Sequence, residues 1–204
     1  MFISFEGIDG CGKTSQSELL LNFLTQKNIS TILTSEPRCD EYIKWSKNIL
    51  NIMLNEKMEI STQVILLNAI RNEHLQKVIL PNLKNNNIVI CDRFIHSTIA
   101  YQHYGFRCNL EYIKDLHIKL QNNIFPDVTY FIDIPIEVAK KRITIRGKGT
   151  KFDKLPNEIF NKIRNGFTQM AKESEYIVTI DGGKTKNEIF KIIKNDLINR
   201  LGIL

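Results

Sequence analysis

The feature that most limits what this chain of 204 residues can fold into is an octapeptide near its start, Gly7-Ile8-Asp9-Gly10-Cys11-Gly12-Lys13-Thr14. It fits the pattern G-x-x-x-x-G-K-[ST]. The short apolar run Phe2–Glu6 precedes it, and the chain from Lys13 onward has the apolar spacing of a helix. This order predicts a phosphate-binding loop, because glycines let backbone N–H groups converge on phosphate oxygens at the positive end of a helix.

Such a loop predicts a nucleoside triphosphate site and leaves the second substrate open. Lys13 can reach the β- and γ-phosphates, and Thr14 can ligate Mg²⁺. Nucleotide contacts are expected from Gly7, Ile8, Asp9, Gly10, Cys11, Gly12, Lys13, Thr14 and Ser15. The alternative is a chance glycine-rich turn before a helix.

Strand-like and helical stretches alternate along the rest of the chain. The expected strands are Phe2–Glu6, Thr31–Ser35, Ile88–Cys91, Val128–Ile132 and Tyr176–Ile180. The expected helices are Lys13 to about Lys27, Asp40–Asn55, Ser61 to about Leu83, Leu110–Gln121, Ile136–Arg146, Asn157–Glu173 and Thr185–Leu201. Ser61 is the expected N-cap of the third helix, and Pro81 should bend or end it. Strands separated by helices need crossover connections, so we predict one α/β domain over residues 1–204, a three-layer α/β/α fold with a five-stranded parallel sheet.

Composition and charge exclude several classes of protein. No apolar run reaches the roughly 18 residues of a membrane helix, and the N-terminus lacks the pattern of a signal peptide. The four cysteines form no CxxC pair, so we expect reduced thiols in a cytoplasmic protein and no zinc site. The formal net charge of +6 is compatible with nucleic-acid binding. No aromatic-rich RNA signature accompanies it, which favours a solvated basic surface with cations for an anionic substrate.

Further motifs follow one another along nearly the whole chain. They are Phe5-Glu6-Gly7-Ile8-Asp9-Gly10, Glu36-Pro37, Arg71, Asp92-Arg93, Ser97-Thr98-Ile99-Ala100-Tyr101-Gln102, Pro126-Asp127, Asp133, Arg142 and Arg146-Gly147. Their order and spacing resemble the bacterial form of the thymidylate kinases. The resemblance implies a P-loop NTPase fold and transfer of the γ-phosphoryl group of ATP to dTMP, giving dTDP. It also implies Mg²⁺, held through Thr14 and Asp92, and a homodimer.

Two arginines have roles that their positions and the resemblance both support. Arg93 follows a buried strand, where ligands bind in open α/β sheets, and its fork can hold the acceptor phosphate. Arg71 lies in an apolar helix and needs a partner, which in the family is the thymine carbonyl. The alternatives are a strand-capping surface arginine for Arg93 and an ion pair with Glu73 or Glu59 for Arg71.

The resemblance also assigns contacts to the rest of the acceptor. Asp9 contacts the 3′-hydroxyl, Tyr101 blocks a 2′-hydroxyl, and Thr98 and Gln102 share a helical face toward the base. A turn-forming acid and a core tyrosine are the alternatives for Asp9 and Tyr101. Acceptor contacts are therefore expected from Asp9, Glu36, Arg38, Lys47, Leu67, Arg71, Arg93, Ser97, Thr98, Tyr101 and Gln102.

Catalytic charge is expected from Lys13, Arg93 and a lid at about residues 142–153. Arg142 and Arg146 are four residues apart and share a helix face, and glycines and lysines follow them. The phosphate loop has Cys11 and no arginine of its own, which is consistent with cations supplied by the lid. The adenine is expected beside Arg142 and the segment Asp181-Gly182. The alternative for the predicted lid is a solvated basic loop.

The chain departs from the family pattern at several positions. Ser35, Arg38 and Cys39 surround Glu36-Pro37, where the family has an arginine before and two glycines after. Lys47 stands for an arginine, Leu67 for an aromatic residue and Lys151 for a lid arginine. Because a lysine cannot form a bidentate fork and a leucine cannot stack as a ring, we expect weaker acceptor binding and the same reaction.

Two other functions stay open on the sequence. A deoxynucleoside kinase would need a general base for a neutral hydroxyl acceptor, and Glu36 is available for that role. A nucleotide-dependent switch or nucleic-acid-binding protein would use the basic charge instead.

Overall fold

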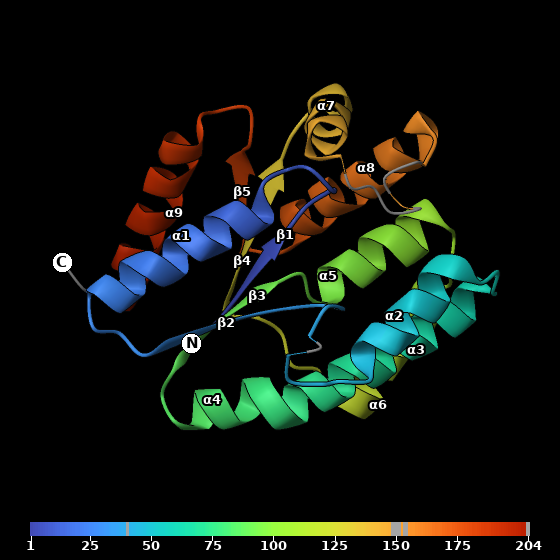
Figure 1. Ribbon diagram of the computed structural model, residues 1–204, viewed down its shortest axis with the longest axis horizontal. Helices are drawn as coiled ribbons and strands as arrows, with labels where there is room; N and C mark the ends of the chain where they lie inside the picture. Colours follow the sequence, from blue (N-terminus) through green and yellow to red (C-terminus); the bar gives the residue numbers. More distant parts are fainter. Residues whose placement is uncertain (40, 148–151, 153–154, 203–204) are drawn as a thin grey trace.

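A computed structural model describes residues 1–39, 41–147, 152 and 155–202 of the protein. Its strands are β1 (Phe2–Glu6), β2 (Thr31–Ser35), β3 (Ile88–Asp92), β4 (Val128–Asp133) and β5 (Ile177–Asp181). They form one parallel sheet in the order β2-β3-β1-β4-β5, with helices on both faces (Figure 1). The predicted three-layer fold with five parallel strands is confirmed.

The helices divide between the two faces of the sheet. On one face α1 (Lys13–Gln26) lies beside α9 (Lys186–Leu201), and on the other α5 (Ile95–Thr98) packs against α8 (Asn157–Glu173) (Figure 1). The remaining helical segments are α2 (Ser46–Asn55), α3 (Ile60–His74), the π-helical η1 (Leu75–Ile79), α4 (Leu80–Lys84), the π-helical η2 (Ile99–Gly105), α6 (Leu110–Gln121) and α7 (Ile136–Arg146). One large cluster of buried apolar side chains fills the space between the sheet and its helices.

The register of the two central strands brings the phosphate loop next to the segment that follows β3. Phe5 of β1 is the partner of Asp92 in β3, and the backbone N–H of Arg93 donates to the Phe5 carbonyl at 3.0 Å. Both strands are buried along their length except at Asp92, so their apolar side chains hold this register. The chain order reverses at this point of the sheet, which is where open α/β folds bind ligands.

Three expectations about the helices are wrong in detail. The helix predicted over Asp40–Asn55 begins only at Ser46. The residues before Ser46 form turns, and these turns bring Ile43 into contact with Cys39 and Ile70. Ser61 is not a cap, since α3 begins at Ile60 with Glu59 as its N-cap residue.

The long helix predicted to end near Leu83 does end there, at Lys84, and it contains the π-helical segment η1; the expectation that failed is that Pro81 would end it. Pro81 lies in the first turn of α4, directly after η1. A proline is tolerated there because its missing N–H is not needed. The helix therefore neither stops at Pro81 nor continues far beyond it.

The four cysteines are buried, and none of them forms a disulfide bond within the described part of the chain. None of the helices in the described part of the chain has the length and apolar character that crossing a bilayer requires.

Three buried titratable groups lie around the start of α5. Burial and the neighbouring His117 lower the pKa of His96 to about 3, and burial with the charge of Arg71 lowers the pKa of His117 to about 4. Burial raises the pKa of Glu6 to about 7 against the hydrogen bond from Ser97. His96 Nδ1 is 3.9 Å from Glu6 Oε1 on one side, and its Nε2 is 3.1 Å from the Tyr176 hydroxyl on the other.

These shifts predict acid sensitivity of the fold. Below pH 6.5 the unfolded chain binds protons that buried His96 and His117 do not, so stability falls as the pH falls. Glu6 acts in the opposite direction between pH 4.5 and 7 because its folded form binds the extra proton. The net expectation for these three groups is a loss of about 1 kcal/mol per pH unit between pH 6 and 5.

Urea unfolding at pH 7, 6 and 5 and constant ionic strength measures this slope. His96→Gln should flatten it, because the contributions of the remaining His117 and of Glu6 have opposite signs and nearly cancel. An unchanged slope in the variant would show that His96 is not the group responsible.

Candidate active site

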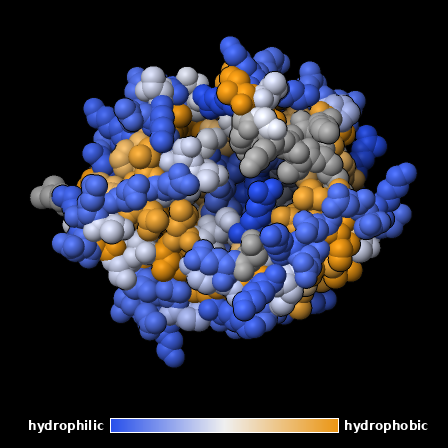
Figure 2. Space-filling view, in the orientation of Figure 1, coloured by the Kyte–Doolittle hydropathy of each residue, from blue (hydrophilic) through white to orange (hydrophobic). Residues whose placement is uncertain are grey.

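A cavity of about 1190 Å³ opens at the carboxyl ends of the strands (Figure 2). Its wall contains the phosphate loop, the segment after β2, the inner face of α3, the start of α5 and the end of α7. The predicted site residues that line it are Asp9, Gly10, Gly12, Lys13, Thr14, Ser15, Glu36, Arg38, Leu67, Arg71, Asp92, Arg93, Ser97, Thr98, Tyr101, Gln102 and Arg142. The fold thus brings most of the predicted residues to one place.

The phosphate loop takes its shape from glycines at positions where a side chain would clash. Gly10 has a φ of 82°, and a Cβ there would lie 2.6 Å from the Ala139 carbonyl oxygen. The buried Lys13 ammonium donates to the carbonyls of Gly7 at 3.1 Å and Ile8 at 3.0 Å. Gly7, Ile8 and Cys11 form the back of the loop and are not part of the cavity wall.

A pair of oxygen ligands lies where the loop enters α1. The Thr14 hydroxyl donates to the Asp92 carboxylate at 2.5 Å, across the ends of two neighbouring strands. Magnesium prefers hard oxygen ligands and is commonly held by one carboxylate, a hydroxyl and substrate phosphates. Among the described residues, no group of three acidic, histidine or cysteine side chains is arranged to hold a metal ion, so a metal here would need the nucleotide as a further ligand.

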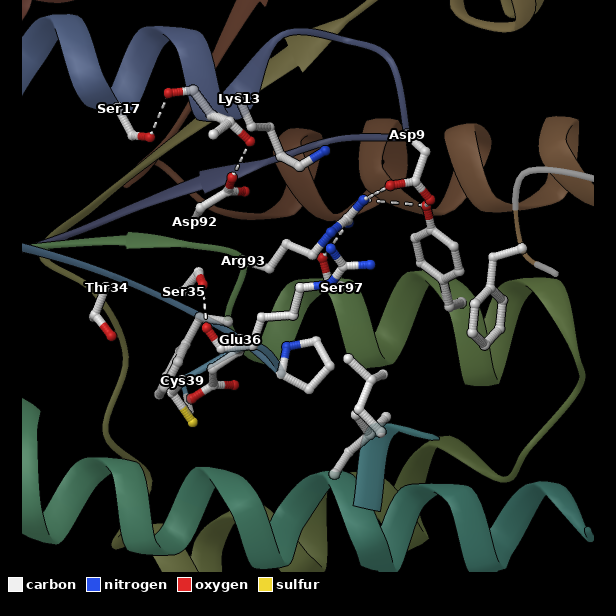
Figure 3. Close-up of a pocket in the computed structure, with 18 of the residues that line it drawn as sticks. Asp9, Lys13, Ser17, Thr34, Ser35, Glu36, Cys39, Asp92, Arg93 and Ser97 are labelled. Carbon is white, nitrogen blue, oxygen red and sulfur yellow. Dashed lines mark hydrogen bonds and ion pairs between the residues drawn. The ribbon is translucent and has the colours of Figure 1, made fainter. Parts of the chain in front are cut away.

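Arg93 is the centre of a charged cluster on the acceptor side of the loop (Figure 3). Its Nη2 is 2.7 Å from Asp9 Oδ1, its Nη1 donates to the Gly7 carbonyl at 3.0 Å and to Ser97 Oγ at 2.8 Å, and Tyr101 donates to Asp9 Oδ2 at 2.8 Å. Burial would raise the pKa of Asp9, but Arg93 and Lys13 outweigh it and hold that pKa below its ordinary value. Asp9 therefore stays ionised and fixes the guanidinium.

Arg71 reaches the cavity from α3 and is almost completely buried. Its Nε donates to Glu36 Oε2 at 2.8 Å and its Nη2 to Thr98 Oγ1 at 2.8 Å. Its Nη1 is buried and has no hydrogen-bond partner among the described residues. The expected alternative, an ion pair with Glu73 or Glu59, is wrong, because Glu36 is the partner and Glu73 pairs with Lys77.

Glu36 is unsuited to act as a general base. Burial would raise its pKa, but Arg71 and His74 together lower it. A carboxylate that both neighbours hold in its ionised form is a weak proton acceptor. This geometry removes the support for a deoxynucleoside kinase with Glu36 as its base.

Arg142 bonds both the phosphate loop and the segment Asp181-Gly182, beside which the adenine was expected. Its Nη1 donates to the Cys11 carbonyl at 3.4 Å and its Nη2 to the Gly182 carbonyl at 3.2 Å. Arg146 ends α7, but its side chain and the whole of Lys151 lie outside the described residues.

Two of the residues that replace family residues are exposed, Lys47 outside the cavity and Arg38 at its rim. Lys47 is exposed on α2 and is not part of the cavity wall. Arg38 is exposed at the rim, where its carbonyl accepts from Ser35 Oγ at 2.6 Å. Leu67 does line the cavity, so an apolar contact remains where the family has a ring.

Sequence reasoning missed three residues next to the site. His74 contacts Glu36 at 3.0 Å, Glu6 accepts the backbone N–H of Phe94 at 2.7 Å, and Phe152 packs edge-on against Tyr101 at 5.9 Å between ring centroids. A signal existed for His74, since it follows Arg71 by three positions and therefore shares its helix face. For Phe152 no signal in the sequence distinguishes a cavity wall from a surface loop.

Comparison with known proteins gives one consistent family. The model of the thymidylate kinase family matches residues 5–193. A thymidylate kinase of Wolbachia pipientis wMel is 39% identical over 98% of this chain and 100% of its own length, and one of Fervidobacterium nodosum is 39% identical over 95% and 96%.

Among solved structures, thymidylate kinase from Ehrlichia chaffeensis superposes with a TM-score of 0.79 at 30% identity, covering 97% of this chain and 98% of that one. A family model and relatives that match nearly the whole chain leave no segment of the fold or of the cavity wall unaccounted for. The chain therefore belongs to the thymidylate kinase family and is a nucleoside monophosphate kinase.

Proposed function

We propose that the enzyme transfers the γ-phosphoryl group of ATP to dTMP, giving dTDP for dTTP synthesis. The observation that carries this proposal is Arg71, whose Nη1 is buried in the cavity wall without a partner among the described residues. A buried guanidinium donor is costly unless a ligand completes it, and the thymine carbonyl is a ligand of the right polarity. Arg93 lies in the same cavity, where the phosphate of the acceptor would be held.

In this proposal the protein positions two anions and stabilises the charge that moves between them. Lys13 is placed for the donor phosphates, and Arg93, whose terminal nitrogens bond Gly7, Ser97 and Asp9 in this structure, supplies positive charge for the acceptor phosphate. Arg142 and Arg146 supply positive charge from the lid, because the phosphate loop has no arginine of its own. The transfer is direct and needs no covalent enzyme intermediate.

Thr14 and Asp92 would hold Mg²⁺, with donor phosphates as the other ligands. The metal would neutralise phosphate charge during transfer. The protein groups fit this use because both are oxygen donors beside the phosphate loop.

Contacts to the deoxynucleoside follow from the same wall. Tyr101 and Asp9 are hydrogen-bonded to each other at 2.8 Å and form the surface for the deoxyribose. Thr98 and Gln102 are placed one turn apart beside Arg71, on the side of the base. Leu67 contributes apolar contact without ring stacking, which supports weaker acceptor binding.

The proposal predicts a specific substrate profile. Pure protein incubated with ATP, Mg²⁺ and each nucleoside monophosphate should turn over dTMP fastest and should not phosphorylate thymidine, since Arg93 requires a phosphate. Removing Mg²⁺ with a chelator should stop turnover, and adding it back should restore turnover. Coupled detection of ADP measures all three arms.

Robust turnover of another monophosphate with none of dTMP would overturn the proposal. ATP binding without any transfer, combined with tight and salt-sensitive DNA binding, would instead favour a nucleotide-dependent switch.

Arg71→Lys tests the base contact with the positive charge kept. A lysine ammonium cannot replace the planar guanidinium, whose separate nitrogens bond Glu36, Thr98 and the base at the same time. Losing one hydrogen bond to a charged group costs about 1.5–3 kcal/mol, so the KM for dTMP should rise by about tenfold to one-hundredfold. The kcat and the KM for ATP should stay close to their wild-type values.

The matched control is Arg164→Lys. Arg164 makes a bidentate ion pair with Asp133, at 2.6 and 2.9 Å, and does not line the cavity. An equal rise in the KM for dTMP in both variants would show that the effect of Arg71 is a general one on the fold.

We also propose a homodimer in the cytoplasm. Large apolar side chains are about half exposed on three neighbouring helices, Ile52 on α2, Ile65 on α3 and Ile118 on α6. Surfaces of this kind are typical of interfaces between subunits. Light scattering should give twice the mass of one chain, and the mass of a single chain at micromolar concentration would contradict the dimer. The lack of a disulfide bond among the four described cysteines supports a reducing compartment.

A further inference from the structure

His74 is a buried histidine to which the proposed reaction gives no role. Its side chain is fully buried at the end of α3, and both ring nitrogens have a partner. Nδ1 is 3.0 Å from Glu36 Oε1, and Nε2 is 2.7 Å from Thr34 Oγ1. With Nδ1–H donating to the carboxylate, Nε2 is left to accept the Thr34 hydroxyl proton, so one tautomer satisfies both bonds.

These bonds form one end of a continuous chain of contacts that leads into the cavity. Thr34 holds His74, His74 holds Glu36, and Glu36 Oε2 accepts from Arg71 Nε at 2.8 Å. Arg71 Nη2 then donates to Thr98 at 2.8 Å. All five side chains are buried, with at most 6% of any residue exposed.

The chain of contacts determines where the free donor of Arg71 points. A guanidinium is planar, so bonds at Nε and Nη2 fix the direction of Nη1. The Nε bond is only as well placed as the Glu36 carboxylate, which would be free to rotate if Arg71 were its sole partner. His74 holds the second oxygen and removes that freedom. It is well placed to do so because it lies three residues after Arg71 on one helix face.

We propose that His74 is a positioning residue for recognition of the acceptor base. It acts through Glu36 to aim the Nη1 donor of Arg71 at the base carbonyl, and Thr34 fixes its own ring. This inference rests on the proposed function, since it assigns the role within the same acceptor site. The bond that counts is the one from Nδ1 to Glu36, and the bond to Thr34 supports it.

Two substitutions separate these bonds. The amide nitrogen of asparagine falls near the position of Nδ1, and that of glutamine falls near Nε2. His74→Asn therefore keeps a donor for Glu36 and loses Thr34, whereas His74→Gln keeps a partner for Thr34 and leaves Glu36 Oε1 without its donor. Both variants lose the ring to a similar extent, so they form a matched pair.

The test is steady-state kinetics with ATP, Mg²⁺ and dTMP, together with the thermal unfolding midpoint of each variant. His74→Gln should raise the KM for dTMP about tenfold, the effect of one hydrogen bond to a charged group, while kcat and the KM for ATP stay within about twofold. His74→Asn should restore the KM for dTMP to within about threefold of wild type. Thr34→Val should raise it less than His74→Gln.

Thr129→Val is the control for loss of a buried threonine bond. Thr129 is as buried as Thr34, and its hydroxyl bonds Ser4 at 2.8 Å between β1 and β4, away from the cavity. It should lower the unfolding midpoint without changing the KM for dTMP.

A merely structural His74 would give a different pattern. Equal loss of unfolding midpoint in the asparagine and glutamine variants, with the KM for dTMP unchanged or raised equally in both, would overturn the inference. A wild-type enzyme that turns over a different monophosphate and not dTMP would overturn the proposed function instead. If the glutamine variant fails to fold, the ratio of KM values for Thr34→Val and Thr129→Val decides the question. A ratio near one then rejects the role.

Discussion

The site depends first on the parallel pairing of β1 with β3. The backbone N–H of Arg93 donates to Phe5 at 3.0 Å, so the residue after one strand is held beside the loop that begins at the end of the other. Arg93 takes a φ of 75° there, and its guanidinium turns back onto the Gly7 carbonyl. A positive φ at a non-glycine residue is unfavourable, and it persists because this pairing and the bonds of the side chain determine it together. The phosphate loop and the guanidinium of Arg93 are therefore held in a fixed position relative to each other.

Carboxylates hold two arginines of the cavity wall, the partly buried Asp9 for Arg93 and the buried Glu36 for Arg71. Buried ion pairs contribute little net stability, because desolvation of the charges offsets their attraction. Their value here is orientation. In Arg71 the carboxylate of Glu36 bonds Nε and the hydroxyl of Thr98 bonds Nη2, which leaves Nη1 as a defined donor for a ligand. A site prepared in this way loses little entropy when an anionic nucleotide binds.

Much of this arrangement was predictable from sequence, and the failures have identifiable causes. The strands and the helices α1, α6, α7, α8 and α9 follow from local apolar periodicity, which the core confirms. The start of α2 was not predictable because packing of Ile43 against Cys39 and Ile70 decides it, and Ile70 is distant along the chain. The partner of Arg71 was missed for the same reason, since Glu36 is 35 residues away and local spacing pointed to Glu73. Motif order identified residues most of which line one cavity, whereas their pairing required the fold.

Under the proposed function, the departures from the family pattern make recognition of the base depend more on directional hydrogen bonds. Leu67 keeps apolar contact but lacks the ring stacking that aromatic pairs add, worth about 0.5–1.5 kcal/mol. Lys47 is exposed outside the cavity and does not replace the lost contact. The buried fork of Arg71 must then supply a larger share of both affinity and selectivity. Since Nη1 can only donate, a base with an amino group at the same edge would leave two donors facing each other without water. Leaving these two donors unpaired costs more binding free energy than the lost stacking contact. The site can therefore keep its selectivity for the base although its affinity is reduced.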